Sequence, residues 1–142
     1  MGSDHLERVA FSGLEPERFF ATTEYPIEAV GWIRAHRSEL GARLYNDYGY
    51  GGFLLWWLPE EKIFIDGRMP AWRIGDRWIF YDYMALTNGD SPAFGVLTKY
   101  GIDWAITAAD GSLDRRFRER PDWRIRYEDD KARVYVKRTI DQ

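Results

Sequence analysis

Residues 45–49 read Tyr-Asn-Asp-Tyr-Gly and residues 64–68 read Phe-Ile-Asp-Gly-Arg, so two apolar stretches each lead into an aspartate followed closely by a glycine. The second stretch belongs to the strongest strand pattern in the chain, residues 62–66, where β-branched and aromatic residues stand in succession. Aspartate and glycine are typical of tight turns. We therefore predict strands at 42–46 and 62–66, each ending in a polar loop.

The sequence around these strands predicts an alternation of helices and further strands. Thr23 suits a helix N-cap, Pro26 suits a first helical turn, and Gly41 suits a helix end. Residues 53–58 are apolar on all sides and fit a short buried helix or a buried strand, of which the preceding glycine pair favours the helix. The remaining predicted elements are helices at 78–86, 91–100 and 112–120, a strand at 102–107, and an antiparallel hairpin of 123–127 with 132–136.

This order predicts an α/β fold, because strands separated by helices usually pair in parallel through right-handed crossovers. We expect a mixed, mostly parallel sheet of about five strands, with helices on both faces and a C-terminal antiparallel hairpin that has one buried and one wet face. A length of 142 residues suits one domain, predicted at 23–138. Residues 1–22 are predicted to be a lead-in that opens with an added Met-Gly-Ser start, and 139–142 a short tail.

The composition argues against several classes of function. A net charge of −3 lacks the basic surface of a general nucleic-acid binder, so no nucleic-acid partner is expected. The chain has no cysteine and two distant histidines, His5 and His36, which argues against a zinc site or a Ser-His-Asp triad, and we expect no metal and no cofactor. The presence of seven tryptophans is compatible with an exposed aromatic surface, although Trp56 and Trp57 fit a buried core.

The two strand ends supply the candidate site residues. In a parallel sheet, the loops at the carboxyl ends of neighbouring strands form the usual ligand crevice, so Asp47, Asp66 and Arg68 are expected to converge at one edge. The glycines within 49–52 permit a close backbone approach or a positive φ. Turn chemistry and helix capping explain the same residues without any ligand. A catalytic pair of Asp47 and Asp66 has no further catalytic feature beside it.

The motifs from Tyr25-Pro26 through 46–52 (Asn-Asp-Tyr-Gly-Tyr-Gly-Gly) to 65–68 (Ile-Asp-Gly-Arg), with 99–104 (Lys-Tyr-Gly-Ile-Asp-Trp) and the closing hairpin, resemble a bacterial domain family. These domains follow the membrane spans of large polytopic proteins that look like GT-C-type glycosyltransferases. The likeness covers residues 23–138. It implies an extracytoplasmic location on the inner membrane and a parent that uses lipid-linked sugars, with the catalytic aspartate on loops outside this chain.

A more distant resemblance concerns the catalytic subunits of oligosaccharyltransferases, whose soluble domain begins with a Trp-Trp-Asp-Tyr-Gly motif that contacts the acceptor peptide. Asp47, Tyr48 and Gly49 match its last three positions, whereas Tyr45 and Asn46 replace the tryptophan pair. Sequon recognition is therefore not expected here. The likeness implies only that the loop after the first strand faces the acceptor side of a membrane-embedded site.

The leading hypothesis is a non-catalytic extracytoplasmic domain that supports acceptor handling, or the stability of the active site, in such a parent. Asp47, Tyr48, Gly49, Asp66 and Arg68 are the candidate contacts to a glycan or acceptor, and the membrane-embedded part of the same protein is the expected partner. An Asp47–Arg68 bridge of purely structural value fits the same residues. A carbohydrate-binding module and a structural or interaction domain remain the alternatives.

Overall fold

The computed structural model describes residues 25–67, 75, 79–89 and 95–139, and the following account concerns these residues. Their helices and strands are, in chain order, α3 (Ile27–Ala35), the 3-10 helix η1 (Arg37–Glu39), β1 (Leu44–Asn46), the 3-10 helix η2 (Tyr48–Tyr50), α4 (Gly51–Trp57), α5 (Ile79–Asn88), α6 (Gly95–Lys99), β2 (Trp104–Ala108), α7 (Ser112–Arg118), β3 (Trp123–Glu128) and β4 (Ala132–Lys137). Thr23, Ser91 and the lead-in 1–22 lie outside the described residues.

The sheet corrects the predicted architecture. It has four strands in the order β1-β2-β4-β3, and only β1 and β2 are parallel. The pairs β2–β4 and β3–β4 are antiparallel. The expectation of a mostly parallel sheet of about five strands was therefore wrong, because the C-terminal strand inserts beside β2 and residues 62–66 form no strand.

The segment 62–66 approaches β1 through a side chain instead of a backbone ladder. The amide oxygen Oδ1 of Asn46 accepts from the backbone N–H of Phe64 at 2.8 Å and of Ile65 at 3.2 Å, while Nδ2 donates to the carbonyl oxygen of Ile65 at 2.7 Å. One side-chain amide thus provides the acceptor and donor that a neighbouring strand would supply. The β propensity of residues 62–66 is overridden by this local partner.

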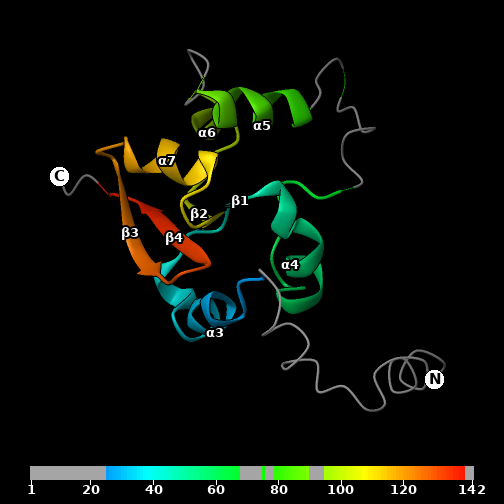
Figure 1. The fold of residues 1–142 in the computed structure, drawn as a ribbon, viewed down its shortest axis with the longest axis vertical. Helices are drawn as coiled ribbons and strands as arrows, with labels where there is room; N and C mark the ends of the chain where they lie inside the picture. Colours follow the sequence, from blue (N-terminus) through cyan, green and yellow to red (C-terminus); the bar gives the residue numbers. More distant parts are fainter. Residues whose placement is uncertain (1–24, 68–74, 76–78, 90–94, 140–142) are drawn as a thin grey trace.

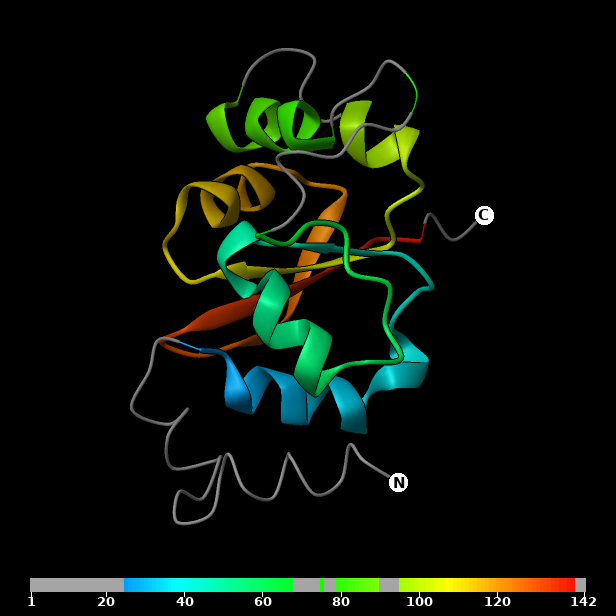
Figure 2. The same ribbon diagram turned by 90° about the vertical axis from the view of Figure 1, so that its right-hand side faces the viewer.

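Helices cover both faces of the sheet (Figures 1 and 2). One face packs against α3 and α4, in a core that includes Val30, Ile33, Leu54, Trp104 and Ile106. The other face packs against α5, α6 and α7, in a core that includes Tyr45, Tyr83, Leu86, Phe117 and Tyr135. Successive residues of a strand point to opposite faces, which is why Tyr45 joins the second core and Leu44 the first.

The C-terminal hairpin forms as expected between β3 and β4, but its burial differs from the prediction. Strand β4 pairs with both β2 and β3, so it lies inside the sheet, and its residues 132–135 are all buried. A strand covered on both faces has no wet side. Strand β3 is the edge and keeps Arg124, Ile125 and Arg126 exposed, with a β-bulge between Ile125 and Tyr127.

Residues 53–58 correspond to α4, so the helical alternative is the one observed. Phe53 and Leu54 are buried, but Leu55 is 38% exposed and Trp56 is 73% exposed. The expectation that the Trp56-Trp57 pair belongs to the core was therefore wrong for Trp56. Among the described residues, none of the helices has the length and apolar character needed to span a bilayer.

Candidate functional site

The carboxyl ends of β1 and β2 form the region in which the sequence places its candidate residues. Because the two strands are parallel and in register from Leu44 with Trp104 to Asn46 with Ile106, their following residues leave the sheet at the same edge. The backbone N–H of Asp47 donates to the carbonyl oxygen of Ile106 at 3.0 Å and so continues the pairing by one residue. From there the chain turns through η2 directly into α4.

The side chain of Asp47 joins three elements at this edge. One carboxylate oxygen, Oδ1, accepts from the hydroxyl of Tyr83 on α5 at 3.2 Å, and the other, Oδ2, accepts from the backbone N–H of Ala108 at the end of β2 at 3.3 Å. The carboxylate is half-buried. Both oxygens therefore already hold protein donors, which is the arrangement of a stabilising junction.

Tyr83 is the second member of this junction. Its hydroxyl accepts from the backbone N–H of Tyr48 at 3.0 Å and donates to Asp47, so it connects two consecutive residues of the loop. Burial, reinforced by the nearby Asp47 charge, raises the pKa of Tyr83 to about 12. The phenol therefore stays protonated and remains a donor over the physiological pH range. Burial also raises the pKa of the neighbouring Tyr45.

Asn46 attaches the second loop to the first. Its side chain is fully buried and, besides the bonds to Phe64 and Ile65, its Nδ2 donates to the carbonyl oxygen of Asp47 at 2.9 Å. Four hydrogen bonds thus use every polar position of the amide. These bonds bring the segments 45–47 and 64–65 together, although the second stretch is not a strand.

Glycine serves a packing purpose in this loop. A Cβ atom on Gly51 would lie 2.2 Å from the carbonyl oxygen of Ile65 and 2.6 Å from Cα of Asp66, so only glycine fits between the two segments. Gly49 and Gly52 face open space, and none of the three has a positive φ. The alternative that these glycines reach a left-handed conformation was therefore wrong, and the close approach is to the chain itself.

The remaining predicted residues have different surroundings. Asp66 is buried, at 2% exposure, beside the backbone of Gly51. Tyr48 is half-buried, and its hydroxyl lies 4.0 Å from the position that a Cβ would take on Gly67. Gly49 is exposed. Arg68, and with it the predicted bridge to Asp47, lies outside the described residues.

A second buried polar cluster follows β2 and was missed by the sequence analysis. Asp114 on α7 is fully buried and accepts from Nη1 of Arg133 at 2.5 Å, from the hydroxyl of Tyr135 at 2.5 Å and from the backbone N–H of Asp110 at 2.9 Å. The basic segment 114–120 begins with this buried carboxylate, which anchors α7 to β4.

Tyr83 and Asn46 are the two members of the junction to which the sequence analysis gave no role. Tyr83 lies on α5, far along the chain, and nothing in its neighbours marks which face of α5 meets the loop. Asn46 did carry an indication: a polar residue that closes an apolar strand must find hydrogen-bond partners once it is buried. Its partners in 64–65 could not be read from spacing alone.

Asp82 on α5 takes part in a further polar contact. It is half-buried and accepts from Nζ of Lys99 at 2.5 Å and from the hydroxyl of Tyr100 at 2.6 Å. These bonds tie α5 to the end of α6. No cluster of three or more potential metal-ligating side chains occurs in the described part of the chain.

Comparisons with models of protein families, with curated proteins and with solved structures found no match to this chain.

Proposed function

We propose that this chain is a non-catalytic, extracytoplasmic domain of a GT-C-type membrane glycosyltransferase, and that it stabilises the parent enzyme instead of carrying out sugar transfer. The observation that carries this proposal is the position of the Asp47 carboxylate, whose two oxygens accept from Tyr83 on α5 and from the backbone N–H of Ala108 at the end of β2 and so connect three elements. The two bonds use two of the four lone-pair positions of the carboxylate. Of the two roles expected for the loop, structural support accounts for both contacts.

The class of the parent rests on the resemblance of residues 23–138 to domains that follow polytopic membrane segments. The partner in this proposal is the membrane-embedded portion of the same protein. Its contact surface is α4, which begins directly after the junction and presents Leu55 and Trp56 outward. Tryptophan is enriched where proteins meet the headgroup region of a bilayer, so Trp56 suits a surface that faces the membrane.

The test uses the complete gene product in its native membrane. Placing the photo-cross-linker benzoylphenylalanine at position 56 should yield an intramolecular cross-link to a loop between membrane spans. Benzoylphenylalanine in place of Arg124, on the far edge strand β3, is the matched control and should yield no such cross-link. A complete product without membrane spans would contradict the proposal.

The non-catalytic part has its own test. The purified domain is incubated with polyprenyl-phosphate and polyprenyl-diphosphate sugars, with and without acceptor, and released or transferred sugar is measured. The proposal expects neither hydrolysis nor transfer. Turnover by the domain alone, abolished in Asp47→Asn, would place catalysis in this chain.

A carbohydrate-binding module is the second candidate, and the exposure of Trp56 favours it. An indole that is 73% exposed beside the apolar Leu55 offers a flat face on which a sugar ring can stack. Calorimetry against a panel of glycans at millimolar concentration distinguishes this candidate. It expects binding that is lost in Trp56→Ala and kept in Tyr81→Ala, which removes another exposed ring on α5.

A further inference from the structure

The two asparagines of this chain, Asn46 and Asn88, have opposite surroundings. Asn46 is fully buried, and hydrogen bonds use every polar position of its amide. Asn88 is exposed and is followed by Gly89, which is also exposed. Asparagine before glycine is the pair most prone to deamidation, because glycine has no Cβ to keep its nitrogen from reaching the side-chain amide. This reaction is therefore open to Asn88 and blocked at Asn46.

Asn88 is the last residue of α5, where the helical hydrogen bonding ends. The N–H of Gly89 donates to the carbonyl oxygen of Leu86 at 3.2 Å, at the long end of the usual range. Helix ends of this kind open at little cost in free energy. Once this bond opens, rotation of the backbone at Asn88 brings the nitrogen of Gly89 to the side-chain amide.

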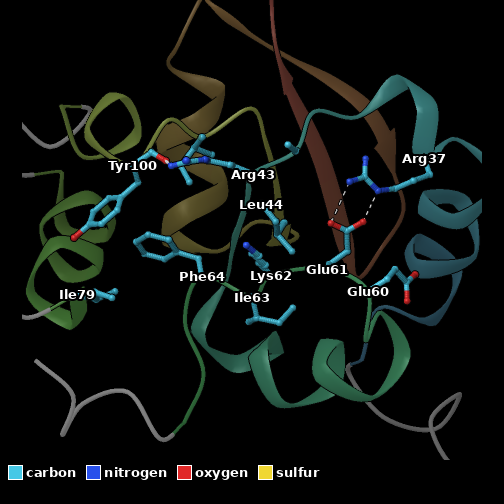
Figure 3. A pocket seen from close by; sticks show the side chains of 12 residues that line it. Arg37, Arg43, Leu44, Glu60, Glu61, Lys62, Ile63, Phe64, Ile79 and Tyr100 are labelled. Carbon is cyan, nitrogen blue, oxygen red and sulfur yellow. Dashed lines mark hydrogen bonds and ion pairs between the residues drawn. The ribbon is translucent and has the colours of Figure 1, made fainter. Parts of the chain in front are cut away.

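The preceding turns of α5 are held in place, so this opening stays confined to the last turn. Ile79, Tyr83 and Leu86 are buried. Tyr100, on the wall of a groove of about 640 Å³ (Figure 3), reaches α5, where its hydroxyl donates to Asp82 at 2.6 Å. Segments fixed by buried side chains and by side-chain hydrogen bonds open less readily than exposed ends.

Arg116 on α7 restrains the end of α5. Its Nη2 donates to the carbonyl oxygen of Asn88 at 3.1 Å, and its Nε donates to that of Thr87 at 3.5 Å. A Cβ atom on Gly89 would lie 2.4 Å from Cζ of Arg116, so the guanidinium lies directly against this glycine. The last carbonyls of a helix have no partner within it, and a cation there stabilises the helical conformation. Arg116 therefore resists the rotation that the reaction needs.

We propose that the pair Asn88-Gly89 is a self-modification site of this protein, and that Arg116 slows the reaction by holding the end of α5. The site lies outside the Asp47 junction, and the proposal does not depend on the proposed parent enzyme.

The reaction needs only water and a base. The backbone nitrogen of Gly89 loses its proton and attacks Cγ of Asn88. The N–Cγ bond forms, the Cγ–Nδ2 bond breaks, and the side-chain nitrogen leaves as ammonia with the proton returned to it, which gives a five-membered succinimide. Water then opens the ring at either carbonyl and leaves aspartate or isoaspartate at position 88. A neutral amide becomes a carboxylate, so the net charge of −3 becomes more negative by one.

The test incubates the folded protein at mildly alkaline pH and follows each asparagine by tryptic peptide mapping and mass spectrometry. Isoaspartate is quantified by enzymatic methyl transfer from S-adenosylmethionine. A synthetic peptide of residues 85–91 provides the rate of the unrestrained pair. We expect Asn88 to convert more slowly than this peptide, and Asn46 to convert at least about tenfold more slowly than Asn88, because Asn46 must wait for larger unfolding.

Variants separate the roles of the two residues. Arg116→Gln should speed conversion at Asn88 by about threefold to tenfold, since the hydrogen bonds that hold the helix end are lost. Arg115→Gln makes the same charge change at the exposed neighbouring position of α7 and should alter the rate by less than about twofold. Asn88→Gln should abolish the product, because the longer side chain must close a less favourable six-membered ring. Circular dichroism verifies that each variant is folded.

Three outcomes would overturn the proposal. The first is conversion at Asn88 that is no faster than at Asn46 in the folded protein. The second is a folded Arg116→Gln variant that converts at the wild-type rate or more slowly. The third is isoaspartate found only at the pairs Asp66-Gly67 and Asp110-Gly111, which would assign the reaction to aspartate isomerisation elsewhere in the chain.

Discussion

Asn46 and Ile65 are hydrogen-bonded in both directions: the side-chain amide of Asn46 donates to the carbonyl oxygen of Ile65 at 2.7 Å and accepts from its N–H at 3.2 Å. This is the pairing that two neighbouring strands make through their backbones, here made by one side chain. It lets a segment of strand-like sequence lie beside β1 without extending the sheet. The stability of the loop region therefore depends on the amide chemistry at one position.

Replacing Asn46 with aspartate tests this dependence, because the shape is kept and the donating group is lost. The bonds to the carbonyl oxygens of Ile65 and Asp47 would be replaced by repulsion in a fully buried site. We expect Asn46→Asp to lower the free energy of unfolding by about 2–4 kcal/mol. Urea unfolding followed by circular dichroism measures it. Asn88→Asp, at an exposed position, should change it by less than about 1 kcal/mol.

The two adjacent glycines of α4 should respond to alanine with opposite signs. A methyl group on Gly51 would collide with the backbone of Ile65 and Asp66, whereas one on Gly52 meets open space. We expect Gly51→Ala to lower the free energy of unfolding by about 2 kcal/mol or more. Gly52→Ala should gain up to about 1 kcal/mol, because alanine is the better helix former. Equal effects in urea unfolding would show that the close approach is not tight in solution.

Alkaline pH should weaken the fold through Tyr83. Its pKa is raised to about 12 in the folded protein, so the folded state holds the phenol proton more tightly than the unfolded chain, where the pKa is about 10. The resulting stabilisation is fully present below pH 10 and is lost as the pH rises to about 12. Over this pH interval, we expect the free energy of unfolding of the wild type to fall by up to about 2–3 kcal/mol more than that of Tyr83→Phe.

The measurement is the midpoint of urea unfolding at intervals between pH 9 and pH 12. Tyr45 is present in both proteins; its pKa is raised by burial and by the neighbouring Tyr83, so the difference between the two profiles includes this coupling. Parallel pH profiles for wild type and Tyr83→Phe would contradict the role assigned to the Tyr83 hydroxyl.

The buried Asp114 and the exposed Asp110 contact the same guanidinium and form a matched pair. Nη1 of Arg133 lies 2.5 Å from Asp114 and 3.3 Å from Asp110, whose side chains are 0% and 82% exposed. Asp114→Asn removes the charge that compensates the largely buried Arg133. We expect this variant to lower the free energy of unfolding by about 3 kcal/mol or more. Asp110→Asn should cost less than about 1 kcal/mol, since exposed pairs contribute little. Thermal and urea unfolding of both variants provide the comparison.

Several elements of the fold could be predicted because their patterns are local. The antiparallel pairing of β3 with β4 follows from two alternating runs around a polar turn, and a short helix, α7, forms where one was predicted, although its N-cap is Gly111 and not the predicted Ser112. The glycine pair before residues 53–58 correctly favoured α4. In each case the deciding interactions connect residues that are close in sequence.

The sheet order and the junction could not be predicted because they depend on distant partners. Residues 62–66 have high strand propensity, but their backbone groups bind the buried side-chain amide of Asn46 and form no backbone hydrogen-bond ladder with β1. The C-terminal strand β4 enters the sheet beside β2, and its alternating pattern does not reveal that both faces become covered. The segments 45–47 and 64–65 do lie together. The hydroxyl of Tyr83 donates to Asp47 from α5, and no spacing in the sequence encodes which residue of α5 reaches this loop.

The position of β4 inside the sheet has a consequence for how the protein is made. A chain leaves the ribosome from its N-terminus, so β1 emerges long before its partner β2, and β2 before β4, the last of the strands in the described residues. The interior of the sheet is therefore completed only when residues 132–137 are available. Until then β1 and β2 have exposed edges that other nascent chains can reach. Folding of this domain is thus expected to be completed only after residues 132–137 have been synthesised, and a stop codon before residue 132 would remove the sheet's interior strand.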